Sequence, residues 1–139
     1  MNKKFIERLD MYPDMHSIKT LCNKKLPNFV WDYFDSSTGK ELVKIRNTKD
    51  LSNVLLKTKI LEGNLNPNIS AELLGNKYEF PLGVAPVGMS GLCFPNSEIF
   101  LAKEAISKNF PYVLSTVSAC SIERLAENVN IDNRIWFQL

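Results

Sequence analysis

The chain has 139 residues, of which 45% are hydrophobic and 23% are charged, values typical of a soluble globular domain. This composition excludes a collagen-like, coiled-coil or disordered protein, and polar residues interrupt every apolar run before it reaches the roughly 18 residues of a membrane-spanning helix. The net charge of +2 is too small for a face that binds nucleic acid. The basic N-terminus is followed by Glu7 and Asp10 where a signal peptide would be apolar, so we expect a cytoplasmic protein.

The first part of the chain, residues 1–75, is predicted to form helices and loops. Asp14 is a candidate N-cap for a short amphipathic helix. Pro27 stands where the first turn of a helix tolerates proline, directly before the aromatic segment 29–34. Apolar residues recurring over 42–54 predict a further helical passage.

From residue 76 the sequence alternates between apolar segments of strand length and segments of helical period. The predicted strands are 82–86, 112–115 and 135–139, and the predicted helices between them are 97–109 and 121–128. Strands that alternate with helices pair in parallel, and runs that are apolar on both faces are typical of a sheet buried on both sides. We therefore predict an α/β fold, with a helical segment over 1–75 followed by the first part of a parallel domain over 76–139.

The chain is too short to complete a large domain of this type. A closed (β/α)8 barrel takes about 250 residues, and three strands cannot close one. The sequence also stops at Leu139 inside an apolar strand, whereas natural domain ends are usually polar and exposed. We therefore expect an incomplete barrel, in a fragment of a longer protein or one half of a split enzyme.

The carboxyl ends of the three predicted strands carry the residues best suited to bind a ligand. Pro86, Val87 and Gly88 lead from a strand into a turn, where a glycine permits close approach of a flat ligand to the backbone. Ser115 and Gln138 end the next two strands, and ligands of parallel α/β folds gather at this edge. A glycine, a hydroxyl and an amide suit a polar heterocycle. In the competing interpretation the glycine serves the turn, the serine caps a backbone amide and the glutamine is a polar rim residue.

The remaining polar residues are given structural roles from the sequence. His16, the sole histidine, is expected to be exposed or capping rather than a general base. Glu98 is expected to complement the dipole of its helix from the first turn. Tyr33 lies in an aromatic cluster and, on its own, is predicted to be a core residue with its hydroxyl at the edge. The three cysteines lack the spacing of a zinc site or a disulfide framework, so no metal is predicted.

Five blocks of the chain carry a family pattern. They read LPNFVWDY at 26–33, RN and DLS within 46–52, PLGVAPVG at 81–88, STVSACSIE at 115–123 and WFQL at 136–139. In this order and spacing they resemble the FMN-dependent α-hydroxy acid dehydrogenases, which include glycolate oxidase, mandelate dehydrogenase and the respiratory L-lactate dehydrogenases. The resemblance covers nearly the whole chain, and the blocks at 81–88 and 115–123 are most similar to the bacterial cytochrome-linked L-lactate dehydrogenase branch.

The resemblance implies a fold, a cofactor and roles for individual residues. The fold is a helical segment followed by the first three strands of an FMN-binding (β/α)8 barrel. Tyr33 is implied to direct its hydroxyl to the substrate carboxylate. The implied flavin-binding residues are Pro86, Val87 and Gly88, whose backbone lies near flavin N5, and Ser115 and Gln138, which hydrogen-bond to polar edges of the isoalloxazine. The implied reaction oxidises a small 2-hydroxy acid, L-lactate first, to a 2-keto acid, and the histidine base of the family is expected beyond this chain.

The resemblance also implies partners and alternatives. A quinone or a cytochrome is the implied electron acceptor. A respiratory acceptor in turn implies peripheral association of the protein with the cytoplasmic face of the inner membrane. No basic amphipathic helix in the sequence supports this location independently. An incomplete barrel further implies a C-terminal half or a second copy as partner. Two other hypotheses stay open: a non-catalytic polypeptide, alone or paired with a separate half, and an unrelated parallel α/β module that holds a small ligand.

Overall fold

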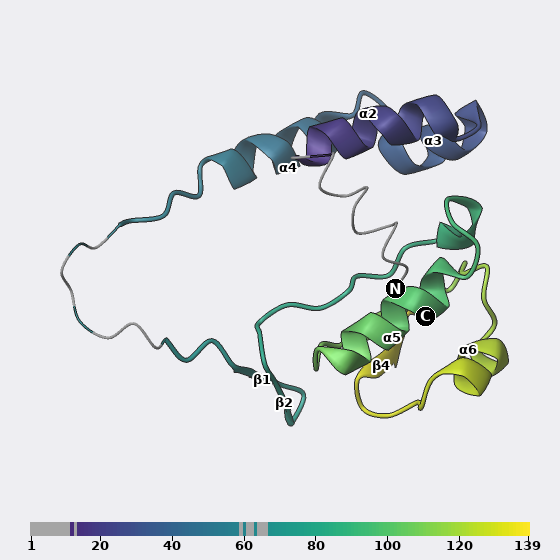
Figure 1. Ribbon diagram of the computed structural model, residues 1–139. Coiled ribbons are helices and arrows are strands. Elements are labelled where there is room, and N and C mark those ends of the chain that lie inside the picture. Colours follow the sequence, from purple (N-terminus) through teal and green to yellow (C-terminus); the bar gives the residue numbers. More distant parts are fainter. Residues whose placement is uncertain (1–11, 13, 59, 61–62, 64–66) are drawn as a thin grey trace. The chain divides into compact units, whose positions relative to one another are not determined.

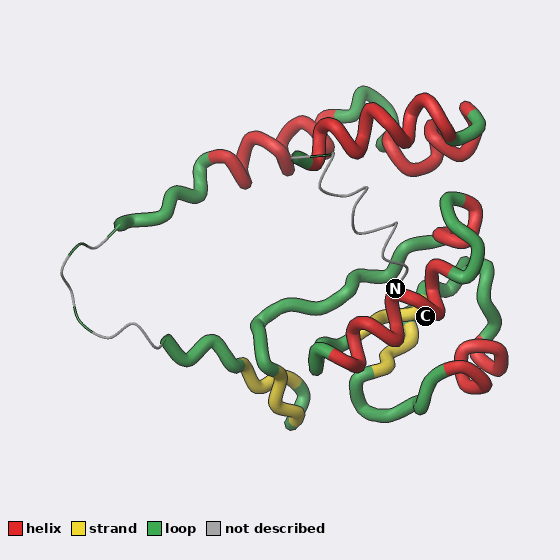
Figure 2. The backbone as a smooth tube through the Cα atoms, in the orientation of Figure 1, coloured by secondary structure: helices red, strands yellow, loops and turns green. Residues whose placement is uncertain are grey.

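The computed structural model has an α/β fold with few strands and no closed barrel among the residues that it describes, which are 12, 14–58, 60, 63 and 67–139. The chain divides into two compact units, Met1–Ile60 and Leu61–Leu139. The described part of the first unit is helical, and the described strands all belong to the second (Figures 1 and 2). The predicted α/β class is therefore confirmed.

The described helices of the first unit are α2 (Met15–Lys25), α3 (Asn28–Asp35) and α4 (Leu42–Ser52). Asp14 caps α2 as predicted, because its carboxylate accepts the Ser17 N–H at 2.7 Å. Pro27 precedes α3 as its N-cap, one position earlier than the sequence indicates. Proline is tolerated there because the N–H groups at a helix start have no partner within the helix.

Asp35 links the three helices of the first unit. Its carboxylate forms ion pairs with Lys19 of α2 and Lys44 of α4, the latter at 3.5 Å between Nζ and Oδ2. Hydrogen bonding from Lys19 holds the pKa of Asp35 below its ordinary value. The apolar side predicted for the third helix is present on α4 but exposed, since Leu42 and Leu51 are 57% and 74% exposed. The described helices of the first unit are therefore linked by ion pairs at Asp35, and the apolar side of α4 is not covered by the described residues.

The second unit begins with an antiparallel hairpin that the sequence did not predict. It pairs β1 (Ala71–Leu73) with β2 (Asn76–Tyr78). The two turn residues, Leu74 and Gly75, both have positive φ, at 52° and 74°. Two left-handed positions match the twist of a two-residue hairpin turn. Leucine is an unusual residue in this conformation, and strands of three residues are too short to show an alternating pattern.

Parallel pairing follows in the same unit. β3 (Tyr112–Leu114) pairs in parallel with β4 (Ile135–Phe137), so the second and third predicted strands form in shortened form. The first predicted strand, 82–86, is reduced to a parallel bridge between Val84 and Tyr112. Val84 donates to Pro111 O at 2.8 Å and accepts the Val113 N–H at 3.0 Å. Pro86 has no N–H, so the ladder cannot continue past Ala85.

Helices pack on one side of this parallel pair. They are α5 (Ser97–Ser107) and α6 (Ile122–Asn128), with the short 3-10 helix η1 (Ser90–Leu92) before them. α5 packs against β3, η1 and α6. Figure 1 shows α5 lying across the strands. The buried core between these elements comprises Ile99, Ala102, Ala105, Tyr112, Leu114, Cys120, Leu125, Val129 and Ile135.

Leu125→Ala is expected to destabilise the second unit by about 2–5 kcal/mol, because the Leu125 side chain is fully buried and its removal leaves a cavity. Urea unfolding followed by circular dichroism measures the change. Ile122→Ala on the same helix is the matched control, since Ile122 is 51% exposed and should cost far less. Equal losses from the two variants would contradict the core described here.

Candidate functional site

The carboxyl ends of the parallel segments meet at one edge of the sheet. β3 and β4 run in the same direction, and the Val84 bridge adds a third parallel segment beside β3. The ladder reaches Gln138, whose N–H donates to Leu114 O at 2.9 Å. The strand-end edge therefore collects the residues predicted to bind the flavin, Pro86, Val87, Gly88, Ser115 and Gln138.

The register also determines which side chains share a face at this edge. Val84, Tyr112 and Ile135 form one row across the three segments, and all three pack with the helix-covered core. Ser115 directly follows β3, Gln138 directly follows β4, and Val87 lies three positions after the bridge residue Val84. These three residues after the parallel segments, Val87, Ser115 and Gln138, are named here the strand-end row.

Ser115 is the buried polar residue of the strand-end row, at 7% exposure. Its Oγ accepts the Val117 N–H at 3.3 Å, so the capping role of the competing interpretation is present. Among the described residues this hydroxyl donates to no acceptor, which leaves its proton available to a ligand. Thr116 donates its hydroxyl to the backbone oxygen of Gln138 at 2.7 Å and fixes the two strand ends together. The carboxamide of Gln138 lies on an exposed residue and offers a donor and an acceptor.

The segment after Val84 is held beside the segment after β3. The Met89 N–H donates to Val117 O at 2.9 Å. Val87 is 42% exposed, while Pro86 and Gly88 are half-buried. Backbone with a small residue at this point can come close to a flat ligand. The structure thus gathers the five predicted flavin-binding residues along one edge.

Glu98 is a buried carboxylate next to this edge, and its environment was missed by the sequence interpretation. It lies in the first turn of α5 as predicted, but only 1% of it is exposed. Its Oε1 accepts the N–H groups of Gly91 at 3.1 Å and Ala119 at 3.3 Å, and its Oε2 accepts the Ser97 hydroxyl at 3.2 Å. Burial raises the pKa of the Glu98 carboxyl, but the hydrogen bonds outweigh burial and hold the pKa below its ordinary value.

A helical-face argument would have revealed the burial of Glu98. The buried residues Ala102 and Ala105 follow it at spacings of four and seven, which places all three on one face of α5. A carboxylate on an apolar helix face is costly unless it is hydrogen-bonded. The expectation that Glu98 only complements the helix dipole was therefore incomplete.

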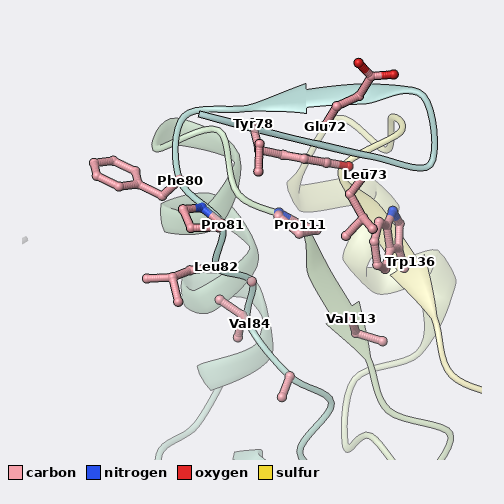
Figure 3. Close-up of a pocket in the computed structure, with 13 residues that line it drawn as sticks. Glu72, Leu73, Tyr78, Phe80, Pro81, Leu82, Val84, Pro111, Val113 and Trp136 are labelled. Atoms are coloured by element: carbon pink, nitrogen blue, oxygen red, sulfur yellow. The ribbon is translucent and has the colours of Figure 1, made fainter. Parts of the chain in front are cut away.

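A hollow of about 460 Å³ lies elsewhere in the second unit, where the β1–β2 hairpin faces the sheet (Figure 3). Val113 and Trp136 project into it from neighbouring strands, and Tyr78 lies between the hairpin and the strands (Figure 3). The Tyr78 hydroxyl donates to Asn133 O at 3.3 Å. None of the five predicted flavin-binding residues lines this largely apolar hollow, so it is distinct from the strand-end edge.

The other predicted site residue, Tyr33, belongs to α3 of the first unit. Its side chain is 45% exposed, and its ring packs edge-to-face against Phe34 with centroids 5.0 Å apart. The cluster predicted around it is present, but the ring is too exposed for a core residue. His16 is exposed on α2, in agreement with a structural role.

Parallel segments that are joined by helices define an α/β protein, a class whose ligands bind at the carboxyl ends of the strands. The pattern of the family described as FMN-dependent dehydrogenase matches residues 22–139. The chain belongs to this family, whose cofactor is FMN.

Curated relatives agree with the family. The L-lactate dehydrogenase of Ectopseudomonas mendocina (strain ymp) is 40% identical over 121 residues, which cover 87% of this chain and 31% of the relative. The L-lactate dehydrogenase of Pseudomonas syringae pv. syringae is 36% identical with the same coverage. The chain thus spans about a third of the length of these relatives.

Solved structures give the same result. A soluble mutant of the membrane-associated (S)-mandelate dehydrogenase from Pseudomonas putida aligns with a TM-score of 0.76 and 34% identity, over 87% of this chain and 34% of that one. A mandelate oxidase aligns with a TM-score of 0.78 and 26% identity, over 92% and 36%. Of the helices described in the present chain, none has the length and hydropathy needed to cross a membrane.

Proposed function

We propose that the chain contributes part of the flavin site in an FMN-dependent 2-hydroxy acid dehydrogenase whose substrate is L-lactate. The observation that carries this proposal is the strand-end row, Val87, Ser115 and Gln138, at the carboxyl ends of three adjacent parallel segments in a member of the FMN-dependent dehydrogenase family. The names of the curated relatives support lactate as the substrate.

The groups at the strand-end edge fit a flavin ring. The isoalloxazine has polar atoms of both kinds along one edge, and a buried polar edge needs partners for all of them. Ser115 offers a hydroxyl proton, and the carboxamide of Gln138 offers both a donor and an acceptor. The backbone of Pro86, Val87 and Gly88 would lie against the ring near N5. Bound FMN supplies the acceptor for the two electrons and hydrogen removed from the α-carbon of the hydroxy acid.

The architecture proposed for the complete protein is a (β/α)8 barrel. Residues 76–139 would supply its first three strands, counting the Val84 segment, and residues 1–75 the helical and loop segment that precedes it, which also contains β1. The face that carries Val113 and Trp136 would then face the barrel interior, which in such folds is filled by side chains. The strand-end edge would lie at the carboxyl end of the barrel, where active sites of this fold are found.

Tyr33 is proposed to bind the carboxylate of the substrate. Its hydroxyl would donate a hydrogen bond to a charged acceptor, and its 45% exposure leaves the side chain accessible. No residue of this chain is assigned the role of catalytic base. We further propose a quinone or a cytochrome as electron acceptor and peripheral association with the cytoplasmic membrane face. The relationship to a mandelate dehydrogenase described as a monotopic membrane protein supports this location.

The proposal is tested by joining residues 1–139 to the matching remainder of the E. mendocina L-lactate dehydrogenase. We expect the joined protein to purify with FMN and to oxidise L-lactate with an artificial acceptor. We expect the isolated chain to lose FMN on gel filtration, to show no turnover and to aggregate, because unpaired strand edges and an open apolar face associate readily.

Propionate is the control substrate for this test, because it lacks the hydroxyl group that is oxidised. A joined protein that folds but binds no FMN would contradict the proposed flavin site. An isolated chain that is yellow, monomeric and active would contradict the proposed incomplete barrel. FMN binding without lactate oxidation would favour a non-catalytic role for this chain.

A further inference from the structure

We propose that Glu98 is a positioning residue that sets the spacing between two walls of the flavin site, an inference that rests on the proposed function. The first wall is the segment 85–91, which carries Pro86, Val87 and Gly88. The second wall is the segment 115–121, which carries Ser115. The two walls belong to different strands, so their spacing depends on contacts between them.

One oxygen of Glu98 joins the two walls. Oε1 accepts the Gly91 N–H at 3.1 Å and the Ala119 N–H at 3.3 Å, and each amide lies a few residues beyond the predicted flavin-binding residues of its wall. The residue is 1% exposed, so water does not compete for these bonds. Hydrogen bonds to a charged acceptor are about twice as strong as bonds between neutral groups.

The walls also touch at Gly91. A Cβ built on this glycine would lie 3.0 Å from the Ala119 Cβ and 3.4 Å from Glu98 Oε2. The absence of a side chain at Gly91 therefore allows the close approach that the carboxylate holds. A second link lies nearer the ligand edge, where the Met89 N–H donates to Val117 O at 2.9 Å.

The carboxylate itself is held in place from α5. Ser97 donates to Oε2 at 3.2 Å, and the Ser97 and Ser90 hydroxyl oxygens lie 2.8 Å apart. Ser90 belongs to η1, at the end of the first wall. Helix α5 also packs on β3. Because Glu98 belongs to α5, its hydrogen bonds hold both walls at fixed positions relative to this helix. A shift of either wall would displace groups that face a bound flavin by a similar amount.

The test compares three variants of the joined protein, which is residues 1–139 followed by the matching remainder of the E. mendocina L-lactate dehydrogenase. Glu98→Met keeps the length of the side chain but removes the acceptor oxygens. Glu98→Gln keeps one acceptor oxygen for the two amides and is the conservative variant. Glu104→Met is the matched control, because Glu104 is exposed on the same helix. Amide hydrogen exchange by NMR reports the link, and FMN titration, followed by quenching of flavin fluorescence, reports its effect on the site.

In Glu98→Met we expect the Gly91 and Ala119 amides to exchange ten to a hundred times faster than in the joined protein with Glu98, the ratio that loss of one hydrogen bond to a charged group produces. The Val113 amide, which bonds to Val84 O, should keep its protection. FMN affinity should weaken at least tenfold in Glu98→Met, recover to within about threefold of wild type in Glu98→Gln, and stay unchanged in Glu104→Met.

Different results overturn different statements. Wild-type protection of Gly91 and Ala119 in Glu98→Met overturns the link, and unchanged FMN affinity despite lost protection overturns the positioning role. If Glu98→Met does not fold, the joined protein with Glu98 still tests the link, because unprotected Gly91 and Ala119 amides in it would exclude the link. A joined protein with Glu98 that shows no FMN binding at any concentration contradicts the proposed function, while the exchange measurement continues to test the link.

Discussion

Gly88→Val is expected to empty the flavin site of the joined protein. Gly88 ends the segment that would lie against the ring near N5, and valine places a branched side chain where backbone alone fits. A side chain at that point separates the ring from the wall, so the loss should appear first in flavin occupancy. We expect the ratio of flavin absorbance to protein absorbance in purified protein to fall at least tenfold.

Ala126→Val is the control for this variant, since Ala126 is exposed on α6 and the substitution also introduces a branched valine side chain. Its flavin content should equal that of the unmodified protein. Addition of FMN during purification should restore part of the occupancy of Gly88→Val, because the polar partners Ser115 and Gln138 remain. A full complement of flavin in Gly88→Val, with only the Michaelis constant changed, would show that Gly88 does not face the ring.

Tyr33→Phe is expected to weaken the apparent affinity of the joined protein for L-lactate by about tenfold to a hundredfold. The variant removes one hydroxyl, and a hydrogen bond to a charged partner contributes roughly 1.5–3 kcal/mol. Because the phenyl ring keeps its edge-to-face contact with Phe34, the helix should stay folded. Steady-state kinetics with an artificial acceptor measure the change, and flavin content should remain constant.

Tyr78→Phe is the matched control, because it removes a hydroxyl that bonds to Asn133 O at the hollow under the hairpin. This variant should lower stability slightly without changing the Michaelis constant. An unchanged Michaelis constant in Tyr33→Phe, together with a fall in flavin absorbance, would reverse the two assignments and place Tyr33 against the cofactor.

The helices and the parallel pair could be predicted because their signals are local. Asp14 satisfies the first free N–H groups of α2, and the apolar spacing of α5 reflects a face that is buried against β3. The hairpin was missed because its turn depends on Leu74 in a left-handed conformation, which costs energy and is selected by tertiary structure. The strand over 82–86 was overestimated because Pro86 removes a donor that the apolar pattern does not reveal.

Some residues of the candidate site could likewise be predicted from local sequence signals, and others could not. Ser115 and Gln138 were predicted from their places at strand ends, because parallel strands bring such residues to one edge. The environment of Glu98 depends on two N–H groups, at Gly91 and Ala119, that are distant in sequence from each other and meet only after folding. No local signal specifies that meeting, although the face shared with Ala102 indicates burial.

The core of the second unit has a consequence for synthesis on the ribosome. Its buried residues all lie between Ile99 and Ile135, so the whole cluster comes from one short stretch of chain. Contacts between residues close in sequence form quickly, because little loop entropy is lost in bringing them together. The two strands and two helices of this stretch can therefore assemble as soon as β4 leaves the exit tunnel, as a nucleus onto which other segments add.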